Sequence, residues 1–379
     1  MKIVLALDSF KGTATAAQAC AAVAEGIAAV APTAEVVLVP MADGGEGTLD
    51  ALSTAHGAAQ HEVTVCGPDG RPVRARWLEL KSTDSDRGAV AVVELAESSG
   101  ITLMERLSPL EAHTVGLGEV MLAALDHGVE EMLIAVGGSA STDAGAGALE
   151  ALGARFLDAD GMVVDPGGRG LARIHDVDTR GLRRPPVRGA TVLTDVTNPL
   201  CGPDGAAAVY GPQKGAEAAD IEQLDAGLAH FASRTALAMA AWSGSEPVDP
   251  SAPGTGAAGG TGFGLATWGA QLRSGAAALA DAAGVDDALV GADLVVVGEG
   301  RFDSQSAQGK VVSEVARRAG AAGVPTALIA GAIDAPTTDF THAYALGDLA
   351  GSPQQAMADT AAWLRAAGAA LATAYEETP

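Results

Sequence analysis

The sequence predicts an α/β protein in which a doubly wound, Rossmann-like parallel-sheet domain carries a second α/β domain as an insertion. Three observations support this fold class. Strand and helix patterns alternate at the start of the chain, a hairpin pattern interrupts them near residue 60, and the alternation returns near residue 293. A chain of 379 residues is also long enough for two domains. We therefore assign residues 1–60 and 285–379 to the first domain and residues 61–284 to the inserted domain.

The first domain begins with a β-branched apolar run at residues 3–7, which predicts a buried strand. An alanine-rich helix at 16–30 and a strand at 36–39 follow after short connections. A further helix is expected from about Glu46, after a glycine-rich turn. Such alternation with short connections is typical of a parallel sheet.

Hairpin patterning marks the inserted domain. Residues 61–80 alternate apolar and polar side chains on either side of a Gly-Pro-Asp-Gly turn, which predicts two antiparallel strands. The stretch 243–264 is rich in Gly, Pro and Ser and is expected to be a loop. The other expected elements are strands at 89–95, 132–136 and 190–193 and helices at 114–127, 216–241 and 266–283.

The first domain resumes with a buried strand at 294–297, which we expect to end at Gly298. The turn that follows carries Glu299, Arg301 and Asp303. Acidic and basic groups directly after a buried strand are typical of a ligand site in an open α/β sheet. The remaining expected elements are a helix at 310–322, a strand at 326–330 and a final helix at 354–374.

Composition and charge exclude several classes of partner. A formal net charge of −24 repels phosphate backbones, so we expect no nucleic-acid partner. No apolar run is long enough to cross a bilayer, and Asp8 interrupts the amino-terminal run, so we expect a cytoplasmic protein with no membrane partner. Three separated cysteines favour structural thiols over a disulfide framework or a zinc site. The histidines lack triad or metal spacing, which favours structural or surface roles.

Six loops with polar side chains follow strands or begin helices, and five of them contain glycine. Glycine lets backbone N–H groups approach an anion, and a protein this acidic needs local basic groups to bind one. These loops are residues 8–12, 42–47, 137–147, 195–199, 254–260 and 298–310.

Several polar residues near these loops have both a functional and a structural interpretation. Lys11 either neutralises a phosphate or carboxylate, or is a solvated lysine before a helix. Asp43 either helps to hold Mg²⁺ or caps the following helix, and its Gly-Gly-Glu-Gly context favours the former. Asp195 is either a general base at a strand end or a turn aspartate. Lys214 lies between glycines, where a surface turn is the alternative.

Residues 254–259 match the pattern G-x-G-x-x-G, but prolines rather than a strand precede them. The dinucleotide fingerprint is therefore incomplete, and a phosphate-cradling loop fits better. The four glycines within 137–147 exceed what a tight turn needs, which favours anion binding by backbone amides at a helix start.

The ordered set of loops resembles the glycerate kinase family over essentially the whole chain. The family's ADGGEGT occurs letter for letter at 42–48, and its GPQKGA at 211–216. Its GGSATNDGGAG motif resembles residues 137–147, where Thr142 stands in place of an amide side chain, so no ligand role is carried to that position. The family's DSFKG, CDVTNPL, PGAGAAGG and GEGRIDSQS…GK motifs resemble residues 8–12, 194–200, 253–260 and 298–310.

The resemblance implies ATP-dependent phosphorylation of D-glycerate with Mg²⁺, giving 2-phosphoglycerate or 3-phosphoglycerate, in two α/β domains with a cleft between them. Phosphoryl transfer requires positioning and charge neutralisation. Asp195 or Asp303 would be the base, and Arg301 would clamp the carboxylate of glycerate. Lys11 would pair with a phosphate or carboxylate, and Asp43 and Glu299 would hold the metal. Nucleotide-binding residues would be Gly44, Gly45, Gly137, Gly138, Ser139, Lys214, Gly256, Gly259, Gly260, Ser304 and Lys310.

Two alternatives come from other functional classes. One is a nicotinamide-dependent hydroxyacid dehydrogenase, against which the incomplete dinucleotide fingerprint argues. The other is a sugar-acid-binding protein without turnover, which would not need so many acidic groups beside glycines. The sequence leaves open which hydroxyl is phosphorylated, which carboxylate is the base, and whether the protein is a monomer or a homodimer.

Overall fold

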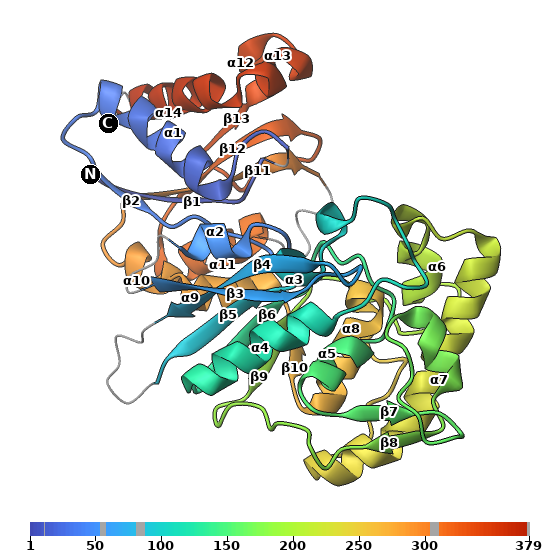
Figure 1. Cartoon of the computed structure of the whole chain (residues 1–379). Coiled ribbons are helices and arrows are strands. Elements are labelled where there is room, and N and C mark those ends of the chain that lie inside the picture. Colours follow the sequence, from blue (N-terminus) through green and yellow to red (C-terminus); the bar gives the residue numbers. More distant parts are fainter. Residues whose placement is uncertain (11, 54–57, 81–87, 304–310, 377–379) are drawn as a thin grey trace. The chain divides into compact units, whose positions relative to one another are not determined.

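The computed structural model describes residues 1–10, 12–53, 58–80, 88–303 and 311–376 (Figure 1). The chain divides into two compact units, each with its own sheet. The mixed α/β class predicted from the sequence is confirmed. The first unit comprises Met1–Asp43, Asp50–His56 and Ser274–Pro379, and the second comprises Gly44–Leu49 and Gly57–Arg273.

The sheet of the first unit has five parallel strands in the order β13-β12-β11-β1-β2. After β1 the next strand, β2, is added on one side of the sheet, whereas after β11 the next strands, β12 and β13, are added on the other side. The adjacent pair β1 and β11 is therefore the topological switch point, where open α/β sheets bind ligands. The strands are β1 Lys2–Leu7, β2 Glu35–Leu38, β11 Leu294–Phe302, β12 Thr326–Ile333 and β13 His342–Ala345.

Helices cover both faces of this sheet (Figure 1). Alternate residues of β1 pack in opposite directions, with Leu5 in one core layer and Val4 in the other. The first layer includes α1 (Ala16–Val30) and α14 (Thr360–Glu376), and the second includes α9 (Gly275–Ala282), α10 (Val285–Leu289) and α11 (Val311–Ala322). The shorter helices are α2 Thr48–Leu52, α12 Leu346–Ala350 and α13 Pro353–Ala358.

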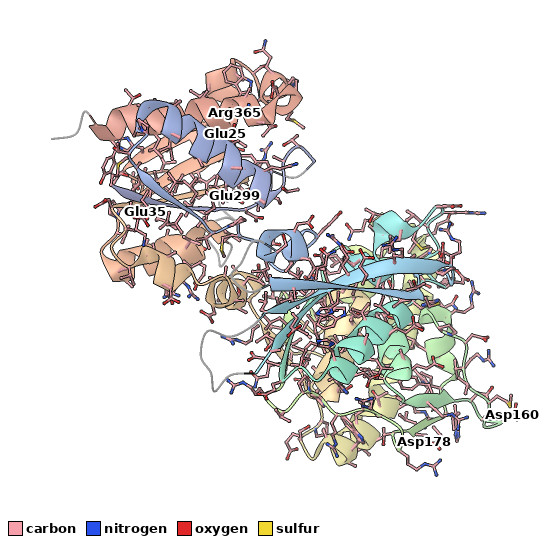
Figure 2. All side chains as sticks on the ribbon, turned by 60° about the vertical axis from the view of Figure 1, so that its left-hand side comes forward. Glu25, Glu35, Asp160, Asp178, Glu299 and Arg365 are labelled. Carbon is pink, nitrogen blue, oxygen red and sulfur yellow. The ribbon has the colours of Figure 1, made fainter. Side chains whose placement is uncertain are left out.

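Helices α1 and α14 approach each other closely because glycines lie at their contact. A Cβ atom at Gly26 of α1 would overlap the carbonyl oxygen of Arg365, and one at Gly368 of α14 would overlap that of Val23. An ion pair between Arg365 and Glu25 spans the same two helices (Figure 2). The predicted helix at 16–30 is confirmed and is capped by Thr15 and Gln18.

The second unit contains a six-stranded mixed sheet in the order β10-β9-β6-β5-β4-β3. The first four strands run parallel, whereas β3, β4 and β5 pair antiparallel, which confirms the predicted hairpin. Helices pack with this sheet around one core. The strands are β3 Ala58–Cys66, β4 Pro72–Leu80, β5 Val90–Glu94, β6 Glu131–Ala135, β9 Ala190–Leu193 and β10 Gln271–Arg273, with β7 Arg155–Leu157 and β8 Asp176–Asp178 forming a separate ribbon. The helices are α3 Ala96–Ser99, α4 Val115–His127, α5 Ala146–Ala151, α6 Ala206–Tyr210, α7 Ala218–Ser243 and α8 Ala257–Trp268.

Three expectations about elements are wrong. The expected loop at 243–264 is confirmed only as far as Gly256, because α8 begins at Ala257. The expected helix at 266–283 is divided into the end of α8, the edge strand β10 and α9, because Gly269 adopts φ 108° and ends α8. The strand expected to end at Gly298 continues to Phe302 by pairing with β12. The final helix is divided at Asp359 into α13 and α14.

The three cysteines, Cys20, Cys66 and Cys201, are free thiols. Across the described ranges, no helix combines the length and apolar character needed to cross a membrane.

Candidate active site

A cavity of about 340 Å³ lies in the first unit at the carboxyl ends of β1, β11 and β12. It coincides with the switch point of the sheet, the position that favours ligand binding. Ser9, Phe10 and Thr13 contribute to its wall, together with the small residues Gly331 and Ala332 of β12. Its charged lining residues are Asp8, Asp43, Glu299, Arg301 and Asp303.

Two strand ends bring these charged groups together. The apolar run of β1 ends at Leu7, and the backbone N–H of the next residue, Asp8, donates to the carbonyl of Gly298 at 2.8 Å. Strand β11 continues beyond that point, pairing Glu299 with Ala330 of β12. A Cβ atom at Gly298 would overlap the carbonyl oxygen of Ile329, so a glycine is needed where β11 passes β12.

Of the lining residues that the structure describes, Arg301 is the cationic one. Its Nη1 lies 2.6 Å from Oδ2 of Asp334, just after β12, and the Asp334 N–H donates to the carbonyl of Phe302. The Arg301 side chain is 67% exposed, so the ion pair orients a guanidinium that solvent and ligand can reach. A guanidinium presents several N–H donors in one plane and suits a carboxylate or phosphate.

Among the described lining residues, the four carboxylates of Asp8, Asp43, Glu299 and Asp303 outnumber the one guanidinium. Such a lining repels an anionic ligand unless a cation accompanies it. Carboxylate oxygens are the ligands that Mg²⁺ prefers, often together with substrate phosphates. The donor set of this cavity therefore fits a magnesium-bound phosphate.

The second unit contains a buried lysine beside a glycine-rich loop. Lys214 is only 3% exposed, and its Nζ donates to the carbonyl of Ser141 and to Oγ of Ser139. Burial lowers the pKa of Lys214 to about 8, although the Asp143 carboxylate opposes this by raising it. The ammonium group is thus held against the loop 137–147 rather than in solvent.

Asp143 anchors that loop to the start of α4. Its carboxylate accepts hydrogen bonds from the N–H and hydroxyl of Thr114 at 2.9 and 2.8 Å, and from the N–H groups of Gly145 and Gly147 at 3.1 and 3.3 Å. The side chain is fully buried. Four hydrogen bonds to one buried carboxylate indicate that Asp143 positions the loop.

The glycines at 256 and 259 permit close contacts between loops of the second unit. A Cβ atom at Gly256 would overlap the carbonyl oxygen of Pro199, and one at Gly259 would overlap that of Ser141. The N–H of Ala144 donates to the carbonyl of Gly259 at 3.1 Å. These protein contacts already require glycine, so the G-x-G-x-x-G pattern has a structural explanation independent of any ligand.

The segment 44–49 packs against the same assembly of loops. The N–H of Gly137 donates to the carbonyl of Gly44, and a Cβ atom at Gly137 would overlap Cα of Gly45. The buried carboxylate of Glu94, at the end of β5, accepts hydrogen bonds from the N–H groups of Gly47 and Leu49 at 2.9 and 3.0 Å. Glu94 thus binds N–H groups at the amino-terminal end of α2. This is the capping role that the sequence analysis gave as the structural alternative for Asp43.

The structure distributes the predicted site residues between the two units. Asp43, Glu299, Arg301 and Asp303 line the cavity of the first unit. Asp195 is exposed in the second unit, two residues after β9. Lys11, Ser304 and Lys310 lie outside the described residues. The residues of the second-unit loop assembly are Gly44, Gly45, Gly137, Gly138, Ser139, Lys214, Gly256, Gly259 and Gly260.

Sequence reasoning assigned no role to Asp8 or Glu94. Asp8 directly follows β1 and Glu94 is the last residue of β5, so both stand at the carboxyl end of a buried strand that has a parallel neighbour. The rule that drew attention to the residues after β11 applies equally to these positions. It would have identified Asp8 as part of the same cavity.

A doubly wound sheet with a polar cavity at its switch point is the arrangement of α/β proteins that bind small ligands at the ends of their strands. A sequence model of the glycerate kinase family matches residues 3–376. The chain therefore belongs to the glycerate kinase family and is a phosphotransferase with an alcohol group as acceptor. This membership does not favour the dehydrogenase or the binding-protein alternative.

Individual relatives agree with this assignment. The chain is similar to a glycerate kinase of Bacillus subtilis, with 42% identity over 338 residues, which cover 88% of this chain and 85% of the relative. It is similar to a glycerate 2-kinase of Escherichia coli, with 40% identity over 339 residues, covering 88% and 86%. A crystal structure assigned as glycerate kinase 2 of Salmonella typhimurium LT2 superimposes with a TM-score of 0.84 at 37% identity, covering 99% of this chain and 98% of that one.

Proposed function

We propose that this protein transfers the γ-phosphoryl group of ATP to the 2-hydroxyl of D-glycerate, giving 2-phosphoglycerate. The proposal rests on a cavity at the sheet's switch point that is lined by carboxylates and the Arg301 guanidinium, in a chain that belongs to the glycerate kinase family. The similarity to a protein named glycerate 2-kinase supports the choice of the 2-hydroxyl over the 3-hydroxyl.

Asp43 and Glu299 are proposed to hold Mg²⁺, since both line the cavity and offer carboxylate oxygens. Bound there, Mg²⁺ would neutralise charge on the phosphates of ATP. Asp8 lines the same cavity and is positioned by its backbone bond to β11, so we add it to this proposed set.

Arg301 is proposed to bind the carboxylate of D-glycerate through two parallel N–H···O bonds. The ion pair with Asp334 helps to fix the direction of the guanidinium at the cavity. Holding the carboxylate places the neighbouring hydroxyl in a defined position, which is the main contribution that a protein makes to phosphoryl transfer.

Asp303 is proposed to accept the proton of the glycerate hydroxyl, because it lines the same cavity as Arg301. Asp195 is the other candidate. Single-turnover rates of Asp303→Asn and Asp195→Asn at saturating ATP distinguish them, because loss of a general base costs about 10²- to 10⁴-fold in rate. If both variants keep near wild-type rates, neither carboxylate is the base.

Lys214 and the glycine-rich loops of the second unit are proposed to contribute to binding the ATP phosphates. Lys214 keeps its charge below a pKa of about 8, and backbone N–H groups of such loops suit anions. Lys11, Ser304 and Lys310 are proposed as further phosphate or carboxylate partners on the basis of sequence alone.

Release of ADP tests the proposed activity. In a coupled assay, ADP should form only when ATP, Mg²⁺ and D-glycerate are all present. A reaction that instead reduces a nicotinamide with glycerate, without ATP, would support the dehydrogenase alternative. Binding of glycerate with no ADP release under saturating conditions would support the binding-protein alternative.

A further inference from the structure

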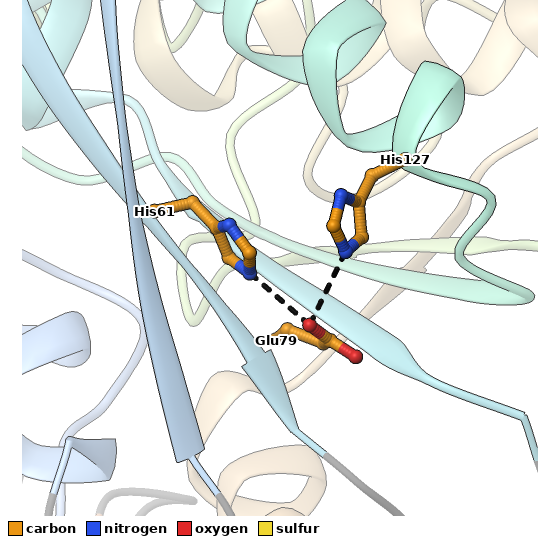
Figure 3. A group of neighbouring side chains, drawn as sticks. All are labelled: His61, Glu79 and His127. Atoms are coloured by element: carbon orange, nitrogen blue, oxygen red, sulfur yellow. Dashed lines mark hydrogen bonds and ion pairs between the residues drawn. The ribbon is translucent and has the colours of Figure 1, made fainter.

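Two imidazoles and a carboxylate from three elements of the second unit converge on one point (Figure 3). His61 lies on β3, Glu79 on β4, and His127 is the last residue of α4. Nε2 of His61 and Nε2 of His127 lie 3.1 and 3.3 Å from the same oxygen, Oε2 of Glu79. The three candidate ligand atoms all lie within 4.8 Å of one another.

The fold holds this cluster in place. In the β3–β4 ladder, His61 pairs directly with Trp77, and Glu79 is two residues further along β4, so the three share one face. The indole of Trp77 stacks on the His61 ring, with centroids 4.2 Å apart and planes at 14°. It also makes an edge contact with the ring of His127 at 5.5 Å. Both imidazoles are therefore oriented by packing before any ligand arrives.

We propose that His61, Glu79 and His127 form a zinc-binding site that links the edge strand β3 to β4 and α4. In a tetrahedral zinc site with bonds of about 2.0–2.1 Å, neighbouring ligand atoms lie about 3.3 Å apart. The separations of the two imidazole nitrogens from Oε2 match this spacing, and the two nitrogens themselves lie within 4.8 Å of each other. Two histidines and one carboxylate are a recurring zinc ligand set, with water in the fourth position.

Exposure and charge also suit an ion entering from solvent. Glu79 is 15% exposed and His61 29%, whereas His127 is 46% exposed and forms the open side of the cluster. The cluster lies at the carboxyl end of α4, where the helix dipole favours a positive charge. Imidazole nitrogens favour Zn²⁺ over Mg²⁺, so millimolar Mg²⁺ should not occupy the site.

The test measures Zn²⁺ binding by calorimetry to untagged full-length protein, without nucleotide and with excess Mg²⁺. We expect one zinc ion per chain, and affinity weakened by about tenfold or more in His61→Ala and His127→Ala. His175→Ala, an exposed histidine elsewhere in the second unit, serves as the matched control and should bind as the wild type does. Glu79→Gln, which keeps the size of the side chain, should also weaken binding.

X-ray absorption at the zinc edge then identifies the ligands. Two imidazoles with only nitrogen and oxygen neighbours would support the proposal. Sulfur neighbours, binding that survives in both histidine variants, or no binding at micromolar Zn²⁺ would each overturn it. Because ADP release from ATP and D-glycerate is measured separately, failure of the zinc proposal is distinguishable from failure of the proposed kinase activity.

Discussion

Replacing Lys214 by Met should change how the stability of the protein depends on pH. Lys214 has a folded-state pKa of about 8, below the ordinary value of 10.5 for a lysine, because burial disfavours its charge. Between these values the unfolded chain holds a proton that the folded chain has released. The free energy of unfolding of the wild type therefore rises with pH across this window. The destabilisation caused by burying the charged lysine is fully present below about pH 8.

The size of the effect follows from the gap between the two pKa values. Each pKa unit corresponds to about 1.4 kcal/mol, so the destabilisation caused by the buried charge is about 3 kcal/mol, and most of it should disappear between pH 7 and pH 10. Lys214→Met contains no titrating group at this position and lacks that contribution. At any single pH, the difference in free energy of unfolding between wild type and variant also includes the effect of changed packing. The way this difference varies with pH reports the titration of Lys214 alone.

Urea unfolding followed by tryptophan fluorescence measures this difference, since three of the four tryptophans, Trp77, Trp242 and Trp268, belong to the second unit. Lys214→Arg provides a second variant, because a guanidinium stays charged throughout the window and should also remove the pH dependence. If the wild-type and Lys214→Met stabilities remain parallel from pH 7 to pH 10, the depressed pKa of Lys214 is wrong.

Three further predictions concern packing, loop anchoring and substrate binding. Gly26→Ala should lower the free energy of unfolding by about 3 kcal/mol, because the added Cβ would overlap the carbonyl oxygen of Arg365. The matched helical control Gly320→Ala has open space around its Cβ and should raise the free energy of unfolding by about 0.5–1 kcal/mol. Equal effects of the two variants in urea unfolding would refute the packing argument. Asp143→Asn should cost about 2–4 kcal/mol, because it weakens four buried hydrogen bonds, and an unchanged urea midpoint would contradict the anchoring role. Arg301→Lys should raise the KM for D-glycerate about tenfold while changing the KM for ATP less than about twofold, and the reverse pattern in steady-state kinetics would place Arg301 on the nucleotide.

Local sequence patterns were sufficient for the elements that depend on local periodicity. The β-branched run of β1, the capped alanine-rich helix α1 and the alternating hairpin around 67–70 all form as expected. The short edge strand β10 could not be predicted, because only pairing with β9 makes Gln271–Arg273 a strand. The extension of β11 to Phe302 likewise depends on pairing with β12.

The candidate site likewise includes residues that local sequence identifies and contacts that it does not. The rule that ligands bind at the carboxyl ends of parallel strands identified Glu299, Arg301 and Asp303 from sequence, and the structure brings all three to one cavity. The buried contact of Lys214 with residues 139–141 joins segments more than seventy residues apart and has no local signature. The cluster of His61, Glu79 and His127 was missed for the same reason, since these histidines show no metal spacing along the chain.

Phosphorus NMR of the reaction product tests the central claim most directly. After incubation with ATP, Mg²⁺ and D-glycerate, the proton-coupled spectrum should contain a new phosphomonoester signal split into a doublet, because carbon 2 of glycerate carries one hydrogen. A triplet would show phosphorylation at carbon 3, which carries two hydrogens, and would contradict the proposed regiochemistry. The absence of any new phosphomonoester signal, with ATP unconsumed, would contradict the proposed kinase activity itself.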